Sequence, residues 1–177
     1  PAYVLRDWAS WPIVVHDLRR AKREALSPNL FEVPHSFTLR PTYEQATYWL
    51  NSLFEQLDEG RVELSVDIET RQRQIACIGI STSTAEAICI PFLCVERPEG
   101  YWTQEEEVHL IELLPKILTH QNLIAFGQNF LYDNQYIAKQ WGFIVPISLD
   151  TMIMQHVLFP ALDKDLGFLA TLYCEHP

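Results

Sequence analysis

The chain of 177 residues has the size of one domain. Apolar residues make up 48% of the sequence and aromatic residues 12%, which is enough to form a hydrophobic core. Charged residues make up only 20%, which excludes a disordered or coiled-coil composition. The excess of 23 acidic over 13 basic residues gives a net charge of −10 and excludes a nucleic-acid binder with a broadly basic surface, although metal ions or a local patch can still supply positive charge.

The first 41 residues are predicted to form a helical extension and a linker. Helix-forming residues are concentrated around residues 17–22, whereas residues 27–41 hold three prolines and little regular patterning. We therefore expect an N-terminal helical extension over residues 1–26 and a linker or an irregular strand entry over residues 27–41.

A helix and three strands are predicted next. Thr42 begins a capping box at the start of a helix that should end at Gly60. Apolar and polar residues then alternate over residues 62–69 with the period of a strand. The apolar segments 74–82 and 86–92 predict two more strands of an antiparallel set.

A second capping box marks the following helix. Thr103 lies three residues before Glu106, and three consecutive glutamates suit the positive end of a helix dipole. Pro115 is expected to kink or divide this helix, because proline lacks a backbone donor. A short buried strand is predicted over residues 123–126.

Three polar residues are predicted to begin the last helices. Asn129 would cap a helix that runs to about Trp141, and Asp150 and Asp165 would cap two more. The order of helix, three strands, and then helices alternating with a strand predicts an α/β fold with a mixed sheet covered by helices.

The cysteines and the ends of the sequence limit the class of protein further. Cys77, Cys89, Cys94 and Cys174 form no C-x-x-C pair and no Cys/His cluster, so we expect free thiols in a reducing compartment. The sequence has no apolar run of 18 residues and no signal peptide, which predicts a cytoplasmic location and no membrane partner. Both ends look cut, and we expect a piece of a longer protein.

Two acidic residues share one face of the first predicted strand. Asp67 and Glu69 project together, roughly 6–7 Å apart at the backbone, opposite Val66 and Ile68. Paired carboxylates repel one another and suit a hard divalent cation such as Mg²⁺ or Mn²⁺. The alternative is a solvated strand face with two ordinary acids, which the spacing alone favours.

A third carboxylate lies on an apolar stripe of a predicted helix. Asp133 shares this stripe with Phe130, Ile137 and Trp141, because spacings of three and four residues fall on one helix face. A carboxylate there is costly unless it is paired, hydrogen-bonded or bound to a metal. Two roles of Asp133 are therefore open: it binds a metal ion, or it is a structural aspartate that accepts hydrogen bonds from nearby backbone groups.

The two acidic segments together resemble a known class of nuclease. Asp-Ile-Glu-Thr at 67–70 and Gly-Gln-Asn-Phe-Leu-Tyr-Asp at 127–133 look like the first two motifs of the DEDD-class 3′–5′ exonucleases, most closely the proofreading domain of family A DNA polymerases. Residues 149–152 and 166–173 resemble the segment that follows in that family. We expect the exonuclease domain to extend over residues 42–177.

The resemblance implies a fold, a reaction and a set of site residues. The fold would be ribonuclease H-like, with a central five-stranded mixed sheet flanked by helices. The reaction would hydrolyse the last phosphodiester at a single-stranded DNA 3′ end with two Mg²⁺ or Mn²⁺ ions and release a nucleoside monophosphate. Asp67, Glu69 and Asp133 would be the catalytic, metal-binding carboxylates. The implied substrate contacts are Thr70, Gln128, Asn129 and Tyr132.

The third motif of the family is not found after Asp133. It places a Tyr or His a few residues before a fourth metal-binding Asp, and we expect it beyond Pro177. The domain would then be incomplete at its C-terminus, and this chain would be weak or inactive alone. The resemblance also implies a DNA polymerase domain further along the parent chain, in a bacterial or phage-infected cell. The alternatives are a catalytically incomplete domain that binds DNA ends or acts as a scaffold, and a ribonuclease D-like enzyme that processes RNA 3′ ends.

The N-terminal segment resembles a different family. Residues 1–25 look like the tail of a bacterial-type uracil-DNA glycosylase, in which a short loop ends in Leu-Arg and a closing helix follows. This implies a glycosylase domain fused upstream. The alternative is a plain leader helix that packs Trp8, Trp11 and Leu18 on the domain.

Overall fold

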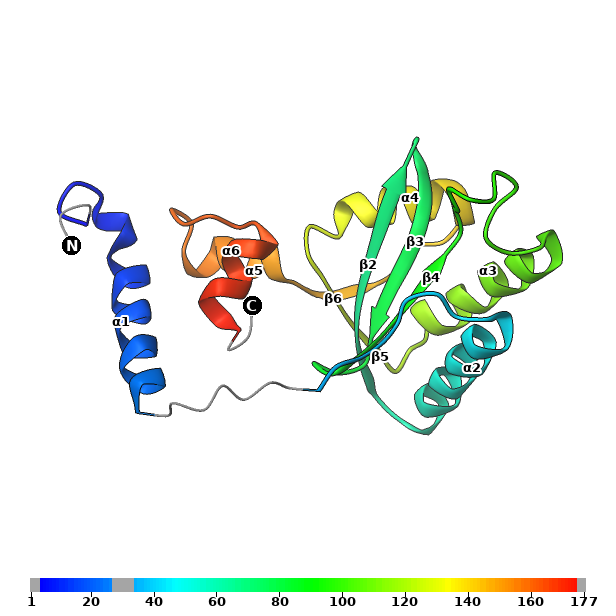
Figure 1. The fold of residues 1–177 in the computed structure, drawn as a ribbon, viewed down its shortest axis with the longest axis horizontal. Helices are drawn as coiled ribbons and strands as arrows, with labels where there is room; N and C mark the ends of the chain where they lie inside the picture. The colour runs from blue at the N-terminus through cyan, green and yellow to red at the C-terminus, as the bar shows by residue number, and fades with distance from the viewer. Residues whose placement is uncertain (1–3, 27–33, 175–177) are drawn as a thin grey trace. The chain divides into compact units, whose positions relative to one another are not determined.

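A computed structural model of the protein describes residues 4–26 and 34–174. The chain divides into two compact units: a first unit of residues 1–33 and 151–177, and a second unit of residues 34–150. Figure 1 shows the second unit as a twisted sheet with helices around it, and the described part of the first unit as mostly helical. The two acidic motifs of the exonuclease resemblance, residues 67–70 and 127–133, lie in the second unit, whereas residues 166–173 belong to the first.

The second unit is built on one mixed sheet. Its strands are β1 (Ser36–Thr38), β2 (Val62–Arg71), β3 (Gln74–Ser81), β4 (Glu86–Pro91), β5 (Leu123–Gly127) and β6 (Ile147–Asp150). They lie in the order β1-β4-β3-β2-β5-β6. β2, β3 and β4 form an antiparallel meander, and β1, β5 and β6 join it through parallel pairs. β2 therefore lies inside the sheet, between β3 and β5.

Strand β2 separates apolar from acidic side chains. Leu64, Val66 and Ile68 are buried, whereas Asp67 and Glu69 lie on the exposed face. This is the alternation predicted from the sequence, and it places two carboxylates on an accessible face while the other face joins the core.

Both predicted capping boxes begin a helix. Thr42 caps α2 (Tyr43–Glu59), which ends before Gly60, and Thr103 caps α3 (Gln104–Leu118). In each helix the side chain at the third position reaches back to the cap amide. The two helices lie side by side in Figure 1 and pack against each other.

The core of the second unit combines the apolar face of the sheet with apolar helix stripes. Side chains from β2, β3, β4, α2, α3 and the third helix α4 (Leu131–Trp141) belong to one cluster. The following members are completely buried: Leu50, Leu57, Leu64, Ile78, Ile90, Leu110, Leu114, Ile117 and Ile137.

The first unit is helical in its described residues. Arg20 donates hydrogen bonds to the carbonyl oxygens of Thr171 and Cys174, each at 3.3 Å, and so ties the N-terminal helix to the C-terminal one. Asp165 caps the last helix, as predicted. No helix in the described part of the chain is long and apolar enough to cross a membrane. The helices of the first unit are η1 (Trp8–Ser10), α1 (Trp11–Ala25), α5 (Thr151–Leu158) and α6 (Leu166–Tyr173).

The sheet differs from the prediction at both edges. It has six strands rather than five, because β1 and β6 are too short to show an alternating pattern in the sequence. Strand β1 lies within residues 27–41, which were predicted to be a linker or an irregular strand entry, and its backbone pairs with β4, Ser36 opposite Glu86. Residues 27–33 lie outside the described residues, as do residues 1–3 of the glycosylase-like segment.

Two helix predictions differ from the structure. Pro115 was predicted to kink or divide α3, and it does not divide it: the helix continues to Leu118, with buried apolar side chains on both sides of the proline. Asn129 does not cap α4, whose cap residue is Phe130, without a side-chain cap of its own. Asn129 instead has a φ of 53°, in the left-handed region, and belongs to the turn before the helix.

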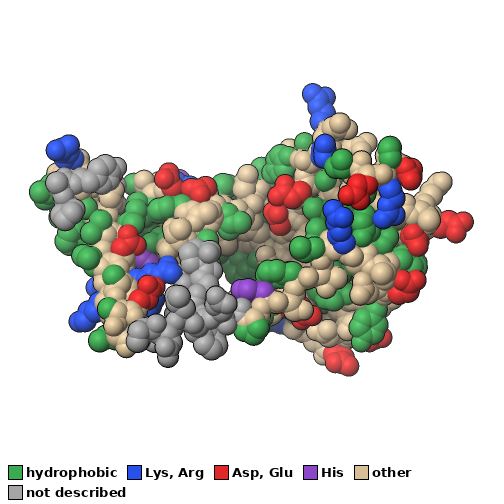
Figure 2. Space-filling model, viewed as in Figure 1, with side chains coloured by type: hydrophobic (Ala, Val, Ile, Leu, Met, Phe, Trp, Pro, Cys, Tyr) green, Lys and Arg blue, Asp and Glu red, His purple; other side chains and the backbone are tan. Residues whose placement is uncertain are grey.

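The surface agrees with the acidic composition. Figure 2 shows Asp and Glu side chains spread over the visible face of the second unit, with Lys and Arg side chains among them. This face is therefore not a broadly basic surface of the kind that binds a phosphate backbone by long-range attraction.

Candidate active site

Asp67 and Glu69 lie beside β3 on the exposed face of β2. In the strand register, Asp67 is opposite Gly79 and Glu69 is opposite Cys77. Because Gly79 has no side chain, it leaves the space next to Asp67 open. The structure thus brings two of the predicted carboxylates together on an accessible surface.

Asp133 approaches β2 from the first turn of α4. The parallel pairing of β2 with β5 ends at Ser65 and Phe126. Beyond that point, the Oδ1 atom of Asp133 accepts a hydrogen bond from the backbone N–H of Ile68 at 3.0 Å. The side chain is only 3% exposed. Asp133 therefore joins Asp67 and Glu69 at β2, and we call these three residues the carboxylate cluster.

A tight turn between β5 and α4 carries Gln128 and Asn129. Gly127 has no room for a side chain, since a Cβ atom there would lie 2.4 Å from Cδ2 of the buried Phe130. The side chain of Asn129 is exposed and that of Gln128 is half-buried. Both predicted substrate residues therefore come from a turn that leads directly into the helix of Asp133.

Asp150 holds this turn from the end of β6, a contact that the sequence analysis missed. Its Oδ1 atom accepts a hydrogen bond from the N–H of Asn129 at 3.1 Å, and its Oδ2 atom accepts one from the N–H of Phe130 at 2.8 Å. The sequence predicted Asp150 only as the cap of the helix that begins at the next residue. No local signal connects it with residues 20 positions earlier, because β5 and β6 meet only in the sheet.

Burial and neighbouring carboxylates raise the pKa values of Asp67 and Asp133. Desolvation, followed by the charges of Asp133 and Glu69, raises the pKa of Asp67 to about 6, although its side chain keeps contact with solvent. Burial raises the pKa of Asp133, and Asp150 and Glu69 add to this rise, while the hydrogen bond from Ile68 opposes it. A cation bound among these groups would relieve the repulsion.

The donor atoms of the carboxylate cluster suit a hard cation. Carboxylate oxygens are the ligands that Mg²⁺ and Mn²⁺ prefer. As the side chains are placed, residues 4–26 and 34–174 contain no group of three or more His, Cys, Asp or Glu that could hold a metal ion. The cluster is therefore a set of neighbouring carboxylates with suitable donor atoms, and it does not form a ready-made metal site in this structure.

Thr70 and Tyr132 contact each other next to the carboxylate cluster. Their hydroxyl oxygens are 2.8 Å apart, just after a register shift between Glu69 and Thr70 in β2. The ring of Tyr132 packs against that of Tyr136, with 5.0 Å between the ring centroids. The sequence analysis missed Tyr136, although its spacing of four residues from Tyr132 places both on one helix face.

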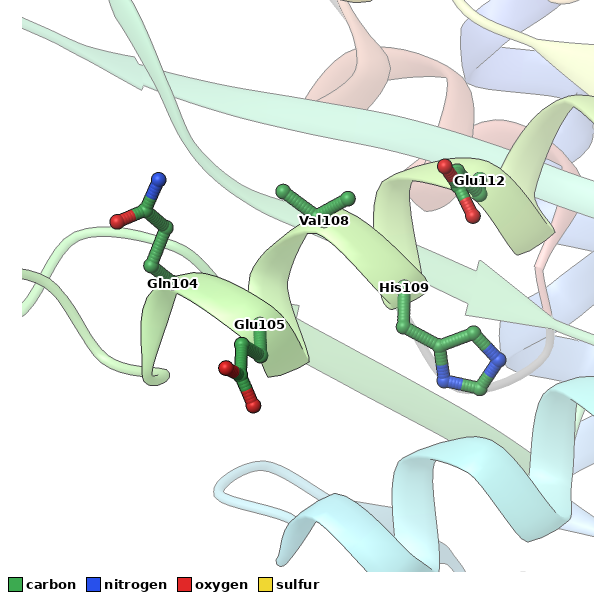
Figure 3. A pocket seen from close by; sticks show the side chains of 5 residues that line it. All are labelled: Gln104, Glu105, Val108, His109 and Glu112. Carbon is green, nitrogen blue, oxygen red and sulfur yellow. The ribbon is translucent and has the colours of Figure 1, made fainter.

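A separate surface pocket lies on α3. Figure 3 shows the five side chains that line it, all from this one helix: Gln104, Glu105, Val108, His109 and Glu112. The Nδ1 atom of His109 is 2.6 Å from the hydroxyl of Tyr43, in α2. None of these residues belongs to the carboxylate cluster, so this pocket is not the candidate site.

Comparison with known proteins identifies the family. A family model described as 3′–5′ exonuclease matches residues 42–177, which is more than half of the chain. The chain belongs to the 3′–5′ exonuclease family. The matched segment of this exonuclease includes the whole carboxylate cluster and the turn before α4. No curated protein sequence matches the chain.

Solved structures share the fold of the exonuclease chain. The catalytic core of RRP6 from Trypanosoma brucei has a TM-score of 0.59 at 18% identity, over 82% of this chain and 36% of that one. The Nibbler EXO domain of Aedes aegypti has a TM-score of 0.56 at 10% identity, over 82% and 72%. Escherichia coli RNase D has a TM-score of 0.51 at 16% identity, over 77% and 32%.

These structural matches confirm the predicted fold class. The second unit is a mixed α/β sheet flanked by helices, as in ribonuclease H-like exonucleases, with six strands rather than five. The exonuclease chain spans about a third of the length of the RRP6 core and of RNase D, at 36% and 32%. At these identities the similarity extends to the fold and not to the substrate.

Proposed function

We propose that this exonuclease uses two divalent ions, Mg²⁺ or Mn²⁺, held by Asp67, Glu69 and Asp133. The observation that carries the proposal is that residues from two distant motifs meet at β2, where Asp133 accepts a hydrogen bond from the N–H of Ile68, between Asp67 and Glu69. Asp67 is the proposed bridging ligand, because the charges of both other members of the cluster act on it. Hard divalent cations would offset this repulsion.

The proposed reaction is hydrolysis of the 3′-terminal phosphodiester. A water oxygen bonds to phosphorus, the bond from phosphorus to the 3′ oxygen of the preceding nucleotide breaks, and that oxygen takes up a proton. The two ions supply activation of the water and neutralisation of charge on the leaving oxygen. Gln128 and Asn129 offer amide donors to the substrate backbone, while Thr70 and Tyr132 border the terminal nucleotide.

The proposed substrate is a single-stranded DNA 3′ end, and the proposed role is proofreading for a DNA polymerase. The support is the similarity of residues 127–133 to the second motif of polymerase proofreading domains. A ribonuclease D-like function is the second candidate, because RNase D, an exoribonuclease involved in structured RNA processing, shares the fold. Degradation rates of DNA and RNA strands of the same sequence, each labelled at the 5′ end, distinguish the two.

The metal assignment is tested by a matched pair of substitutions on β2. Glu69→Gln removes a proposed ligand, whereas Glu63→Gln changes an exposed glutamate on the same face of the same strand. We expect Glu69→Gln to lower nucleotide release in Mn²⁺ at least about 100-fold and Glu63→Gln to leave it within about twofold. Equal effects would contradict the assignment. Binding of 3′ ends without any release by a chain extended past Pro177 would favour the DNA-end-binding alternative.

We also propose that the parent chain completes the site. The fourth carboxylate and its Tyr would lie beyond Pro177, followed by a polymerase domain, and a uracil-DNA glycosylase domain would precede residues 1–25. The support is the sequence resemblance, together with the lack of a Tyr-x-x-x-Asp segment between Asp133 and Pro177. Nucleotide release by a chain extended past Pro177 should greatly exceed that of residues 1–177. Equal rates would contradict this proposal.

A further inference from the structure

Asp150 makes a two-point contact with the turn that carries Gln128 and Asn129. Each of its carboxylate oxygens accepts a hydrogen bond from a successive backbone N–H, those of Asn129 and Phe130. These amides lie at the start of α4, where a helix leaves its backbone donors without intrahelical partners. Phe130, the cap residue of α4, provides no side-chain cap. Asp150, at the end of β6, accepts hydrogen bonds from these amides instead.

The contact fixes a turn with little freedom of its own. Gly127, which pairs with Asp150 in the register of β5 and β6, is packed against the Phe130 ring with no room for a Cβ atom. Asn129 has a φ of 53°, in the left-handed region, which is uncommon for a non-glycine residue although asparagine tolerates it better than most. The carboxylate of Asp150 stabilises this conformation, since it accepts a hydrogen bond from the N–H of Asn129 itself.

We propose that Asp150 is a positioning residue of the exonuclease site, which fixes the turn so that the side chains of Gln128 and Asn129 meet the 3′-terminal phosphate of the substrate. This inference rests on the proposed function. It gives Asp150 a role distinct from that of Asp67, Glu69 and Asp133, because both of its oxygens are engaged by backbone amides. Substituting Asp150 should therefore weaken binding of the 3′ end much more than it changes metal affinity, which Asp150 affects only through its charge near Asp133.

The test compares Asp150→Ala and Asp150→Asn with Thr103→Ala. The asparagine keeps the size of the side chain but turns an NH₂ group toward one of the two amides. The threonine control removes the cap of α3, a helix that carries no residue of the site. Amide hydrogen exchange of Asn129 and Phe130, followed by NMR, reads the contact directly. Fluorescence anisotropy with a 5′-labelled single-stranded oligonucleotide in Ca²⁺ reads 3′-end binding.

We expect both Asp150 variants to speed exchange at the two amides and to weaken binding of the oligonucleotide, each about tenfold. Thr103→Ala should change neither, and Mn²⁺ affinity should change far less than 3′-end binding in the Asp150 variants. Unchanged exchange in the Asp150 variants, or faster exchange with normal binding, would overturn the positioning role. Loss of Mn²⁺ affinity would also overturn it, because Asp150 would then be a metal ligand.

The two proposals fail in different ways. If the unsubstituted chain binds no 3′ end, the proposed function is contradicted. If the unsubstituted chain binds a 3′ end and the Asp150 variants bind it equally well, only the role of Asp150 is contradicted. An oligonucleotide whose 3′ end is blocked by a phosphate serves as the competitor. It keeps the strand but changes its end, so it separates recognition of the 3′ end from general affinity for the strand.

Discussion

The carboxylate of Asp133 takes the place of a strand neighbour for Ile68. The pairing of β5 with β2 ends at Ser65. Beyond it, Asp133, which lies in the helix that follows β5, accepts a hydrogen bond from the N–H of Ile68 at 3.0 Å. This contact places a charged group beside Asp67 and Glu69 and satisfies a backbone donor at the same time. A structural role and the proposed metal-binding role thus fall on one side chain.

Substitutions at Asp133 should separate these two roles. Asp133→Asn retains an oxygen for the N–H of Ile68 and removes the charge, so we expect little change in stability but a large loss of Mn²⁺ affinity. Asp133→Ala leaves the N–H of Ile68 without this partner and should lower the free energy of unfolding by about 1–3 kcal/mol. Urea unfolding and Mn²⁺ titration measure the two effects. Equal stability of both variants would contradict the structural role.

The raised pKa of Asp67 predicts a pH dependence of stability in metal-free protein. Because its pKa rises from 3.8 to about 6 on folding, the folded state binds more protons than the unfolded state between these pH values. The contribution of Asp67 to stability therefore falls as the pH rises from about 4 to about 6 and is level above that. We expect Asp67→Asn to be more stable than the parent above pH 6, with a smaller difference at pH 4.

Urea unfolding at several pH values in the presence of EDTA checks this expectation. Glu63→Gln, on the same strand face, is the control for removal of one negative charge. A difference between Asp67→Asn and the parent that does not vary with pH would contradict the effect. Addition of Mn²⁺ should reverse the order of stability, because the variant loses a proposed ligand.

Gly127→Ala should be strongly destabilising. Its Cβ atom would lie 2.4 Å from the ring of Phe130, which is only 2% exposed and cannot move away without leaving the core. We expect a loss of about 1–3 kcal/mol in the free energy of unfolding. Gly60→Ala is the control, since no atom lies within 4 Å of a Cβ there and its backbone is extended. Similar losses in both variants, measured in urea, would show that packing on Phe130 is not the cause.

The contact between Thr70 and Tyr132 should affect substrate binding more than stability. Thr70→Val and Tyr132→Phe each remove the hydrogen bond, and because it is exposed we expect each to cost only about 0.5 kcal/mol in unfolding. If the bond orients Tyr132 toward the terminal nucleotide, both variants should weaken binding of the 3′ end to a similar extent, and the double variant no further. Additive effects in anisotropy titrations would contradict this coupling.

Several elements were predictable because their signals are local. The capping boxes at Thr42 and Thr103 involve side chains and amides within three residues, and both were confirmed. The alternation over β2 placed Asp67 and Glu69 on one exposed face, since side chains of a strand alternate whatever the strand pairs with.

Other features depend on contacts between distant segments. Strands β1 and β6 have too few residues for a recognisable pattern and form because neighbouring strands offer their backbone groups. Asn129 was wrongly predicted as a helix cap, because the carboxylate that caps this turn comes from residue 150, in another strand.

The motif residues could therefore be named from their order in the chain, because residue type and short spacing are enough to mark them. Their arrangement could not, because it depends on where β5 stops and β6 begins beside it. The end of β5 brings Asp133 to the backbone of Ile68, and the end of β6 brings Asp150 to the turn. Both contacts are long-range hydrogen bonds that form only once the sheet has assembled. They bring the carboxylate cluster and the turn before α4 together in a single candidate site.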